Sequence, residues 1–294
     1  MRLEDYTCAN IRGILSEKDN LEILEHLTFR EFAMLKKLKR DKNEGKLDFG
    51  KTVKQRDMRG LLKEVSEPVN HLLGTDVGLC KVYLTSEFDK KFISSIHYTI
   101  PLICLTGIGL CGLSSVLHDS WYFTPTVSAG MTSIAVAYAA LNHFLWSGKK
   151  SLTSNYTPNR IRIAQSKMAE VLPTLAHEYA HHVIDMKIDF PPWNEAGIAY
   201  LMYQPFFEGI ARGAQKHIAY SYSKDNESFM YNTLKINYKE FFYAYHDIHS
   251  MLTSKNNCLA GGHALGNAYF SIEEFKHGKD VYRKALDEVA ETVC

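Results

Sequence analysis

The spacing of apolar residues predicts a helical N-terminal region. From Asn20 to Lys39 the apolar positions recur three and four residues apart, which places them on one face of a helix. The stretch Asn43–Gly45, with the sequence NEG, carries residues that commonly end a helix. We therefore expect residues 1 to about 75 to be helical.

Strand-like alternation follows in two short stretches. In Gly78–Phe88, Val82 and Leu84 alternate with polar neighbours, and in Asn159–Ala164 isoleucines alternate with arginines. From Gln165 to about Met186 the spacing is helical again, and after a proline-rich turn it stays helical to the end of the chain. Strands followed by helices predict an α+β fold that is mostly helical.

Two long apolar runs lie between the predicted strands. Phe92–Leu117 and Trp121–Trp146 contain no Asp, Glu, Lys or Arg, and each exceeds the roughly 20 residues that a membrane-crossing helix needs. Aromatic residues stand at the ends of the second run, as is common at a membrane interface, and only a short linker joins the runs. The pattern predicts a transmembrane helical hairpin over residues 92–146, in contact with a lipid bilayer. The alternative is a pair of buried helices in a water-soluble core.

The charges that flank the runs predict the orientation of this hairpin. Basic residues precede the first run and follow the second, whereas the linker between the runs has none. Positively charged flanks stay on the cytoplasmic side of a membrane. We therefore expect an integral, two-pass membrane protein with both termini and both large parts of the chain in the cytoplasm. The basic residues concerned are Lys81, Lys90, Lys91, Lys149, Lys150, Arg160 and Arg162.

Composition narrows the class of protein. With 294 residues, 46% of them hydrophobic, the chain can build one good-sized core and a further part. A net charge of +1 gives no reason to expect a nucleic-acid partner, and the basic cluster Met34–Lys42 fits the solvated face of a helix. The six cysteines include no C-x-x-C pair, which indicates a reducing compartment rather than a disulfide framework. The polar first residues carry no secretory signal.

The stretch Leu172–Asp185 carries a candidate metal site. On a helix, His177 and His181 lie on one face one turn apart, so both imidazoles can bind one ion. Glu178 lies beside them and can act as the general base toward a metal-bound water, which is the chemistry of the H-E-x-x-H motif. The surrounding helix is apolar, and buried polar groups without partners are costly. The motif therefore predicts Zn²⁺; the alternative is a partly exposed helix with solvated histidines.

A catalytic zinc ion needs a third protein ligand and an open position for water. Two downstream glutamates compete for that role. Glu195 follows His181 so closely that a second helix could deliver it only after a very tight turn. Glu208 follows at a comfortable distance and opens a stretch with Ala and Gly, whose small side chains permit close helix packing. We favour Glu208 as the third ligand and keep Glu195 as the alternative.

These motifs together resemble the gluzincin metallopeptidases. That group combines a short strand, an H-E-x-x-H helix and a helix with E-G-x-A, and this chain has NRIRIA, HEYAH and EGIAR in that order. The stretch Gly261–Leu286 is similar to the helix pair that follows the site in aminopeptidase-like members. There a tyrosine in a Y-x-x-G motif stabilises the transition-state oxyanion; the matching positions here are His263 and Gly266. The resemblance covers residues 159–286.

A second, weaker similarity is to the HtpX-type membrane metalloproteases. Those proteins combine a membrane hairpin with a cytoplasmic site and carry E-x-x-A-D at the third ligand. This chain has Glu208 and Ala211 but Arg212 in place of the aspartate, and its predicted hairpin follows a substantial N-terminal region.

The resemblance implies a zincin-like fold and hydrolysis of peptide bonds. Glu178 would take the proton of a metal-bound water and pass it to the leaving amine, while His263, Tyr200 or Tyr203 would stabilise the oxyanion. Asp185 lies one turn after His181; a capping or surface role fits it better than orienting a ligand. The substrate would be a peptide or protein. The sequence sets neither the cleavage specificity nor the oligomeric state.

The predicted organisation is then a helical region at 1–75, a zincin-like domain formed by 76–91 and 147–294, and the inserted hairpin at 92–146. The leading hypothesis is a membrane-bound zinc metallopeptidase that acts at the cytoplasmic face. A second is a membrane-anchored interaction or regulatory protein that keeps the zincin fold without turnover, which Arg212 and the missing tyrosine at position 263 favour. A third is a cytosolic metallopeptidase whose apolar runs are soluble core.

Overall fold

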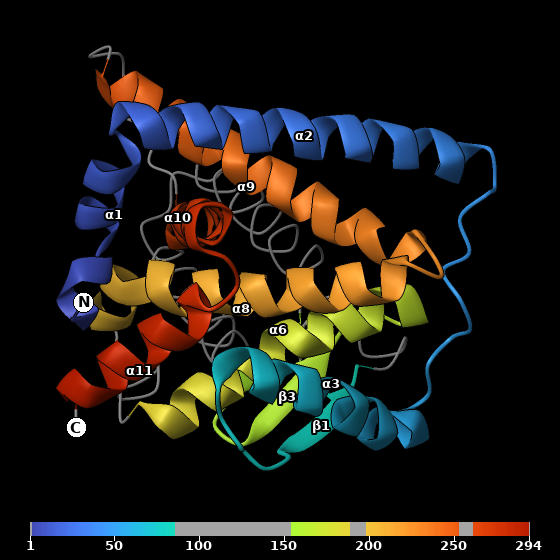
Figure 1. The fold of residues 1–294 in the computed structure, drawn as a ribbon. Coiled ribbons are helices and arrows are strands. Elements are labelled where there is room, and N and C mark those ends of the chain that lie inside the picture. Colours follow the sequence, from blue (N-terminus) through green and yellow to red (C-terminus); the bar gives the residue numbers. More distant parts are fainter. Residues whose placement is uncertain (1, 86–153, 189–197, 253–260, 294) are drawn as a thin grey trace, which may run out of the picture. The chain divides into compact units, whose positions relative to one another are not determined.

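The computed structural model describes residues 2–85, 154–188, 198–252 and 261–293 (Figure 1). The chain divides into two compact units, of which unit 1 comprises Met1–Leu84 and Asn155–Cys294 and unit 2 comprises Thr85–Ser154. Residues 1–75, expected as a region of their own, therefore pack in the same unit as the candidate site. The predicted hairpin at 92–146 lies outside the described residues. Among the described helices, none combines the length and apolar character needed to cross a bilayer.

The N-terminal region is helical, as predicted. The 26-residue α2 (Lys18–Asn43) ends where the NEG stretch predicts, and Gly45 beyond it takes a left-handed conformation (φ +71°) that favours glycine. Buried residues of α2 recur three and four apart, while Lys36, Lys39 and Arg40 of the basic cluster are exposed. The other elements of this region are η1 (Leu3–Tyr6), α1 (Cys8–Leu15), η2 (Gln55–Asp57) and α3 (Met58–Leu73).

Three short strands form one sheet in the order β1-β3-β2, with β1 (Lys81–Leu84) parallel and β2 (Asn155–Thr157) antiparallel to the central β3 (Arg160–Ile163). The structure confirms β3 within Asn159–Ala164. The expectation of a strand from Gly78 was wrong at its start, because β1 begins at Lys81 and pairs with just the four residues of β3. The sequence analysis missed β2, since three residues are too few to show a period. The mostly helical α+β class is confirmed.

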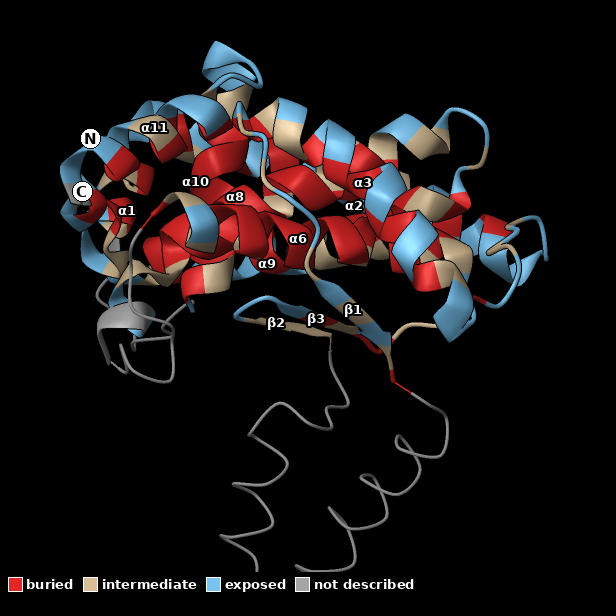
Figure 2. Ribbon diagram, turned by 90° about the horizontal axis from the view of Figure 1, so that it is seen from below, coloured by how far each residue is buried: buried red, intermediate tan, exposed pale blue. Residues whose placement is uncertain are grey.

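Helices after the sheet carry the candidate site and much of the core. The buried isoleucines of β3, Ile161 and Ile163, and the apolar face of α6 belong to one core cluster. In Figure 2 α6 and α8 are buried along most of their described length. Figure 1 shows α8 and α10 in the middle of unit 1, with α2 and α9 on one side and α3 and the sheet on the other. The bounds are α6 (Met168–Lys187), α8 (Ile198–Ser223), α9 (Ser228–Leu252), α10 (Gly262–His277) and α11 (Val281–Val293).

The carboxylate of Glu274 on α10 ties three helices together. It pairs with Lys216 and with His217 Nε2 of α8, the latter at 2.9 Å, and accepts a hydrogen bond of 2.9 Å from the hydroxyl of Tyr282 on α11. Burial alone would raise the pKa of Glu274, but the hydrogen bond from His217 and the charge of Lys216 outweigh burial and lower the pKa to about 2. The ionised carboxylate therefore stabilises the folded state.

We expect Glu274→Gln to lower the free energy of unfolding at pH 7 by about 3 kcal/mol, the equivalent of the pKa difference between about 4.5 unfolded and about 2 folded. Because the folded pKa is depressed, this contribution is complete above pH 4.5 and is lost as the pH falls toward 2. Urea unfolding of wild type and variant between pH 7 and pH 3 measures the difference. Exposed Glu67→Gln on α3 is the control, and a penalty that does not shrink on acidification would contradict the ion-pair origin.

Candidate metal centre

Helix α6 presents both histidines of the motif from a buried surface. Leu172, Leu175 and Ala176 anchor α6 in the core, and His177 and Glu178 are buried with them. The Nε2 atoms of His177 and His181 lie 3.3 Å apart. The backbone N–H of Tyr156 in β2 hydrogen-bonds to the Glu178 carboxylate, which ties this side chain to the sheet.

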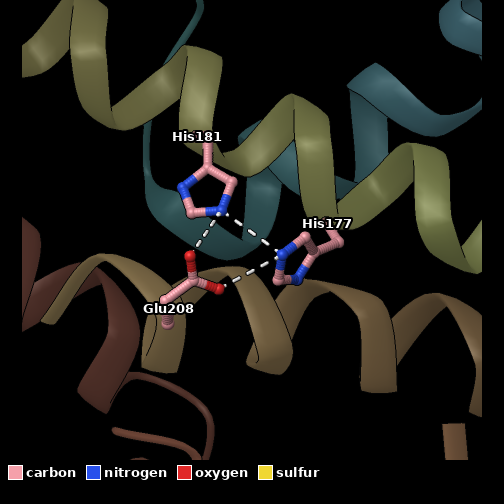
Figure 3. A group of neighbouring side chains, drawn as sticks. All are labelled: His177, His181 and Glu208. Atoms are coloured by element: carbon pink, nitrogen blue, oxygen red, sulfur yellow. Dashed lines mark hydrogen bonds and ion pairs between the residues drawn. The ribbon is translucent and has the colours of Figure 1, made fainter. Parts of the chain in front are cut away.

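Helix α8 supplies the third group. Glu208 Oε2 lies 3.4 Å from His177 Nε2, and Glu208 Oε1 lies 3.6 Å from His181 Nε2. Figure 3 shows the two imidazoles pointing from α6 toward the Glu208 carboxylate on α8. Ligand atoms of these three residues, one from each, all lie within 4.8 Å of one another. The structure thus brings together the three residues that the sequence analysis proposed as ligands.

The spacing of these atoms suits a tetrahedral ion. Zinc binds histidine nitrogen and carboxylate oxygen at about 2.0–2.2 Å, so two ligand atoms of a tetrahedral site lie about 3.4 Å apart. The two imidazole nitrogens lie 3.3 Å apart, and they lie 3.4 and 3.6 Å from the Oε2 and Oε1 atoms of Glu208, respectively. Two imidazole nitrogens and one carboxylate oxygen also form a donor set that catalytic zinc sites use, with a fourth position left for water.

Burial keeps the two histidines in the state that binds a metal. Burial, with the nearby Arg212 cation adding to it, lowers the pKa of His177 to about 3, and burial likewise lowers the pKa of His181. Both imidazoles are therefore neutral at pH 7, and a neutral imidazole keeps the lone pair that a metal needs.

His263 on α10 balances the charge of Glu208. Its Nδ1 lies 2.8 Å from Glu208 Oε2, although 45% of the side chain remains exposed. Burial alone lowers the pKa of His263, but the contact with Glu208 outweighs it and raises the pKa. Burial alone would raise the pKa of Glu208, but the facing histidines hold it well below its usual value. Because Nδ1 faces Glu208, an oxyanion donor at this residue would have to be Nε2.

The pKa of Glu178 is raised, whereas that of Glu208 is lowered. Burial raises its pKa to about 8, and the negative charge of Glu208 adds to the shift. At pH 7 this carboxyl group is therefore mostly protonated in the metal-free protein. The positive charge of a bound ion would lower its pKa again and so supply the carboxylate that a general base needs.

Behind Glu208, Arg212 belongs to a buried polar network. Its guanidinium pairs with Glu240 of α9 at 2.9 Å and donates to Gln215 Oε1 at 2.7 Å. Asn267 of α10 donates to the same Glu240 at 2.8 Å. The arginine that takes the place of the HtpX-type aspartate is thus engaged in an ion pair with Glu240, a partner of which the sequence analysis gave no indication.

Glycines allow α8 and α10 to approach each other closely enough for His263 to reach Glu208. A Cβ atom at Gly266 would lie 2.1 Å from the Pro205 carbonyl oxygen of α8, and one at Gly209 would lie 2.7 Å from the Gly266 carbonyl oxygen. Both distances are far inside van der Waals contact. The glycine after the third ligand and the glycine three residues after His263 are therefore required by packing.

A hydrogen-bond network fixes the other side of α6. The hydroxyl of Tyr156 donates to Asp185 at 2.5 Å and lies 3.4 Å from His182 Nδ1, whose Nε2 lies 3.2 Å from the Gly78 carbonyl. Asp185 therefore contacts β2. Tyr156 and His182 were missed, because β2 is too short to recognise and His182 points away from the ligand face.

Some proposed residues are not placed at the site. Glu195 and the side chain of Tyr200 lie outside the described residues, so both stay alternatives. Tyr203 is partly buried against the core cluster, consistent with a packing role.

Comparisons with known proteins do not assign a family. No protein-family model, no curated protein and no solved structure matches the chain. The case for a metal centre consequently depends on the geometry and chemistry of the residues described above.

We expect Gly266→Ala to destabilise the protein by about 1–3 kcal/mol, because the added methyl group meets backbone atoms that no rotamer change can move. Separating α8 from α10 should also lengthen the His263–Glu208 contact and weaken metal binding. Urea unfolding and a zinc competition titration measure the two effects. Gly60→Ala on α3, where a Cβ meets nothing within 4 Å, is the matched control and should be neutral or stabilising.

We expect Glu178→Gln to stabilise the metal-free protein. Glu178 has a raised folded pKa, so wild-type stability falls as the pH rises from about 4.5 toward 8, whereas glutamine has no such loss. The difference in melting temperature after chelation should therefore grow between pH 5 and pH 8. Equal melting temperatures across that range would mean that Glu178 is solvated rather than buried.

Proposed function

We propose that the protein is a zinc-dependent metallopeptidase with a zincin-like fold. The observation that carries the proposal is the arrangement of His177, His181 and Glu208 at separations of 3.3–3.6 Å, with Glu178, which follows His177 on α6, also buried. A chance H-E-x-x-H sequence would have no reason to meet a buried glutamate from another helix. The resemblance to gluzincins supports the same conclusion from the sequence.

The residues divide the chemistry among them. Neutral His177 and His181 would hold the ion together with Glu208, whose pKa is lowered and whose carboxylate His263 faces at 2.8 Å. Bound zinc would lower the pKa of a coordinated water toward about 7 and polarise the carbonyl of a peptide bond. Glu178 would accept the water proton on its carboxylate and release it to the leaving amine. His263 would keep the Glu208 carboxylate oriented.

The proposed setting is the cytoplasmic face of a membrane. It is supported by the two apolar runs within 92–146 and by their basic flanks. The peptide or protein substrate would then meet the site from the cytoplasm. A regulatory zincin-fold protein without turnover is the second candidate, which the buried Arg212–Glu240 pair at the HtpX-type aspartate position favours.

Zinc analysis tests the metal centre. We expect about one zinc per chain in the full-length protein, and loss of that zinc on His177→Ala and on Glu208→Ala. Glu195→Ala should retain it, as should His71→Ala, an exposed histidine on α3 that serves as the matched control. A well-folded wild type that binds no zinc would exclude the proposal. Loss of zinc from Glu195→Ala would identify Glu195 as the third ligand.

Peptidase activity tests the reaction. Glu178→Gln should keep its zinc while its kcat on a quenched fluorescent peptide library falls by about 10²–10⁴-fold, the contribution typical of a general base. If zinc-loaded wild type is as inactive as Glu178→Gln, both on peptides and on unfolded protein, the result would favour the regulatory candidate.

A further inference from the structure

An exposed aromatic surface runs across α2 and α9, away from the metal centre. The exposed fractions of its side chains are 72% for Phe29 and 41% for Phe32 on α2, and 40% for Phe242 and 47% for Tyr243 on α9. Ring contacts link Phe32 to Tyr238 at 5.3 Å, Tyr238 to Phe242 at 6.0 Å and Phe242 to Tyr243 at 6.2 Å, between centroids, and Phe29 lies one turn before Phe32 on α2. We call Phe29, Phe32, Phe242 and Tyr243 the aromatic patch.

This patch is larger than the scattered exposed apolar residues of an ordinary surface. An aromatic side chain buries about 150–250 Å² when covered, so the exposed parts of these four residues offer roughly 400 Å². That is about half of the ~800 Å² that each partner buries in a specific protein interface. An exposed patch of this size lies within the roughly 300–600 Å² of the largest apolar patch on a typical monomer, which is often functional.

Charges along α2 indicate what covers the patch. The outward face of the helix carries Glu22 and Glu25 on the N-terminal side of the phenylalanines, and Lys36 and Arg40 on the C-terminal side. All four are exposed. A second α2 laid antiparallel across the first, with Phe29 and Phe32 at the centre, would place Glu25 opposite Lys36 and Glu22 opposite Lys39, next to Arg40. The face is therefore complementary to itself, as the isologous interface of a twofold dimer must be.

We propose that the aromatic patch is the interface of a homodimer in which two α2 helices pair antiparallel about a twofold axis near Phe29 and Phe32. The helix is about 39 Å long, enough for the phenylalanines and both charged flanks to lie in one contact. In Figure 1 α2 and α9 lie side by side along one side of unit 1, opposite β1 and β3, so the interface leaves the metal centre and the sheet uncovered. The dimer does not depend on the proposed peptidase activity.

Charge reversal with rescue tests the pairing. Sedimentation velocity of the full-length protein in a density-matched detergent measures the dimer dissociation constant. The double variants Glu22→Lys/Glu25→Lys and Lys36→Glu/Arg40→Glu should each weaken the dimer by about 10-fold or more, because like charges then face one another. The variant that combines all four changes should restore the wild-type constant, since opposite charges face one another again.

Two further variants distinguish loss of the interface from unfolding and from unrelated changes in surface charge. Phe29→Ser should abolish the dimer without changing the melting temperature of the monomer, because that side chain is mostly exposed. The control is the double variant Lys63→Glu/Glu67→Lys at two exposed positions of α3, which should leave the dimer dissociation constant unchanged. The wild type is measured over a 100-fold range of concentration that reaches about 0.1 mM, well above the roughly μM dissociation constants of weak interfaces. A wild type that stays monomeric over this whole range would overturn the proposal. A dimer insensitive to both reversals, as the apolar runs at 92–146 could form, would overturn it too.

Discussion

The buried carboxylate of Glu208 lies where α6, α8 and α10 meet, and the arrangement of the site follows from the need to balance its charge. An ionised carboxylate away from water is costly unless charged or hydrogen-bonding groups face it. His263 of α10, whose pKa the contact with Glu208 raises, faces it at 2.8 Å, and the neutral imidazoles of α6 face it from another side. Three helices far apart in the sequence are thereby fixed relative to one another at a single point.

Close packing makes this arrangement possible. Gly209 and Gly266 let the backbones of α8 and α10 touch, which brings His263 within 2.8 Å of Glu208. One turn after His263 on α10, Asn267 donates a hydrogen bond to Glu240 of α9, the carboxylate that pairs with Arg212. Glu208 of α8 and Glu240 of α9 are therefore each faced by a side chain of α10.

The same burial that positions the groups also sets their reactivity. It keeps His177 and His181 neutral and raises the pKa of Glu178 to about 8. A surface site with these residues would have solvated histidines and an ordinary carboxylate. The protein accepts the cost of desolvating Glu178, which is the kind of local instability that active sites typically carry.

The sequence by itself determined the helical N-terminal region, the central strand, the α+β class and the ligand candidates His177, His181 and Glu208. These follow from local periodicity and from a motif that fits within one helical turn. Only the tertiary structure decided what lies opposite those residues. The contact of His263 with Glu208, the Arg212–Glu240 pair and the role of Tyr156 join residues 22 to 55 positions apart. Their distances depend on how helices and strands pack, and no local spacing of residues encodes that packing.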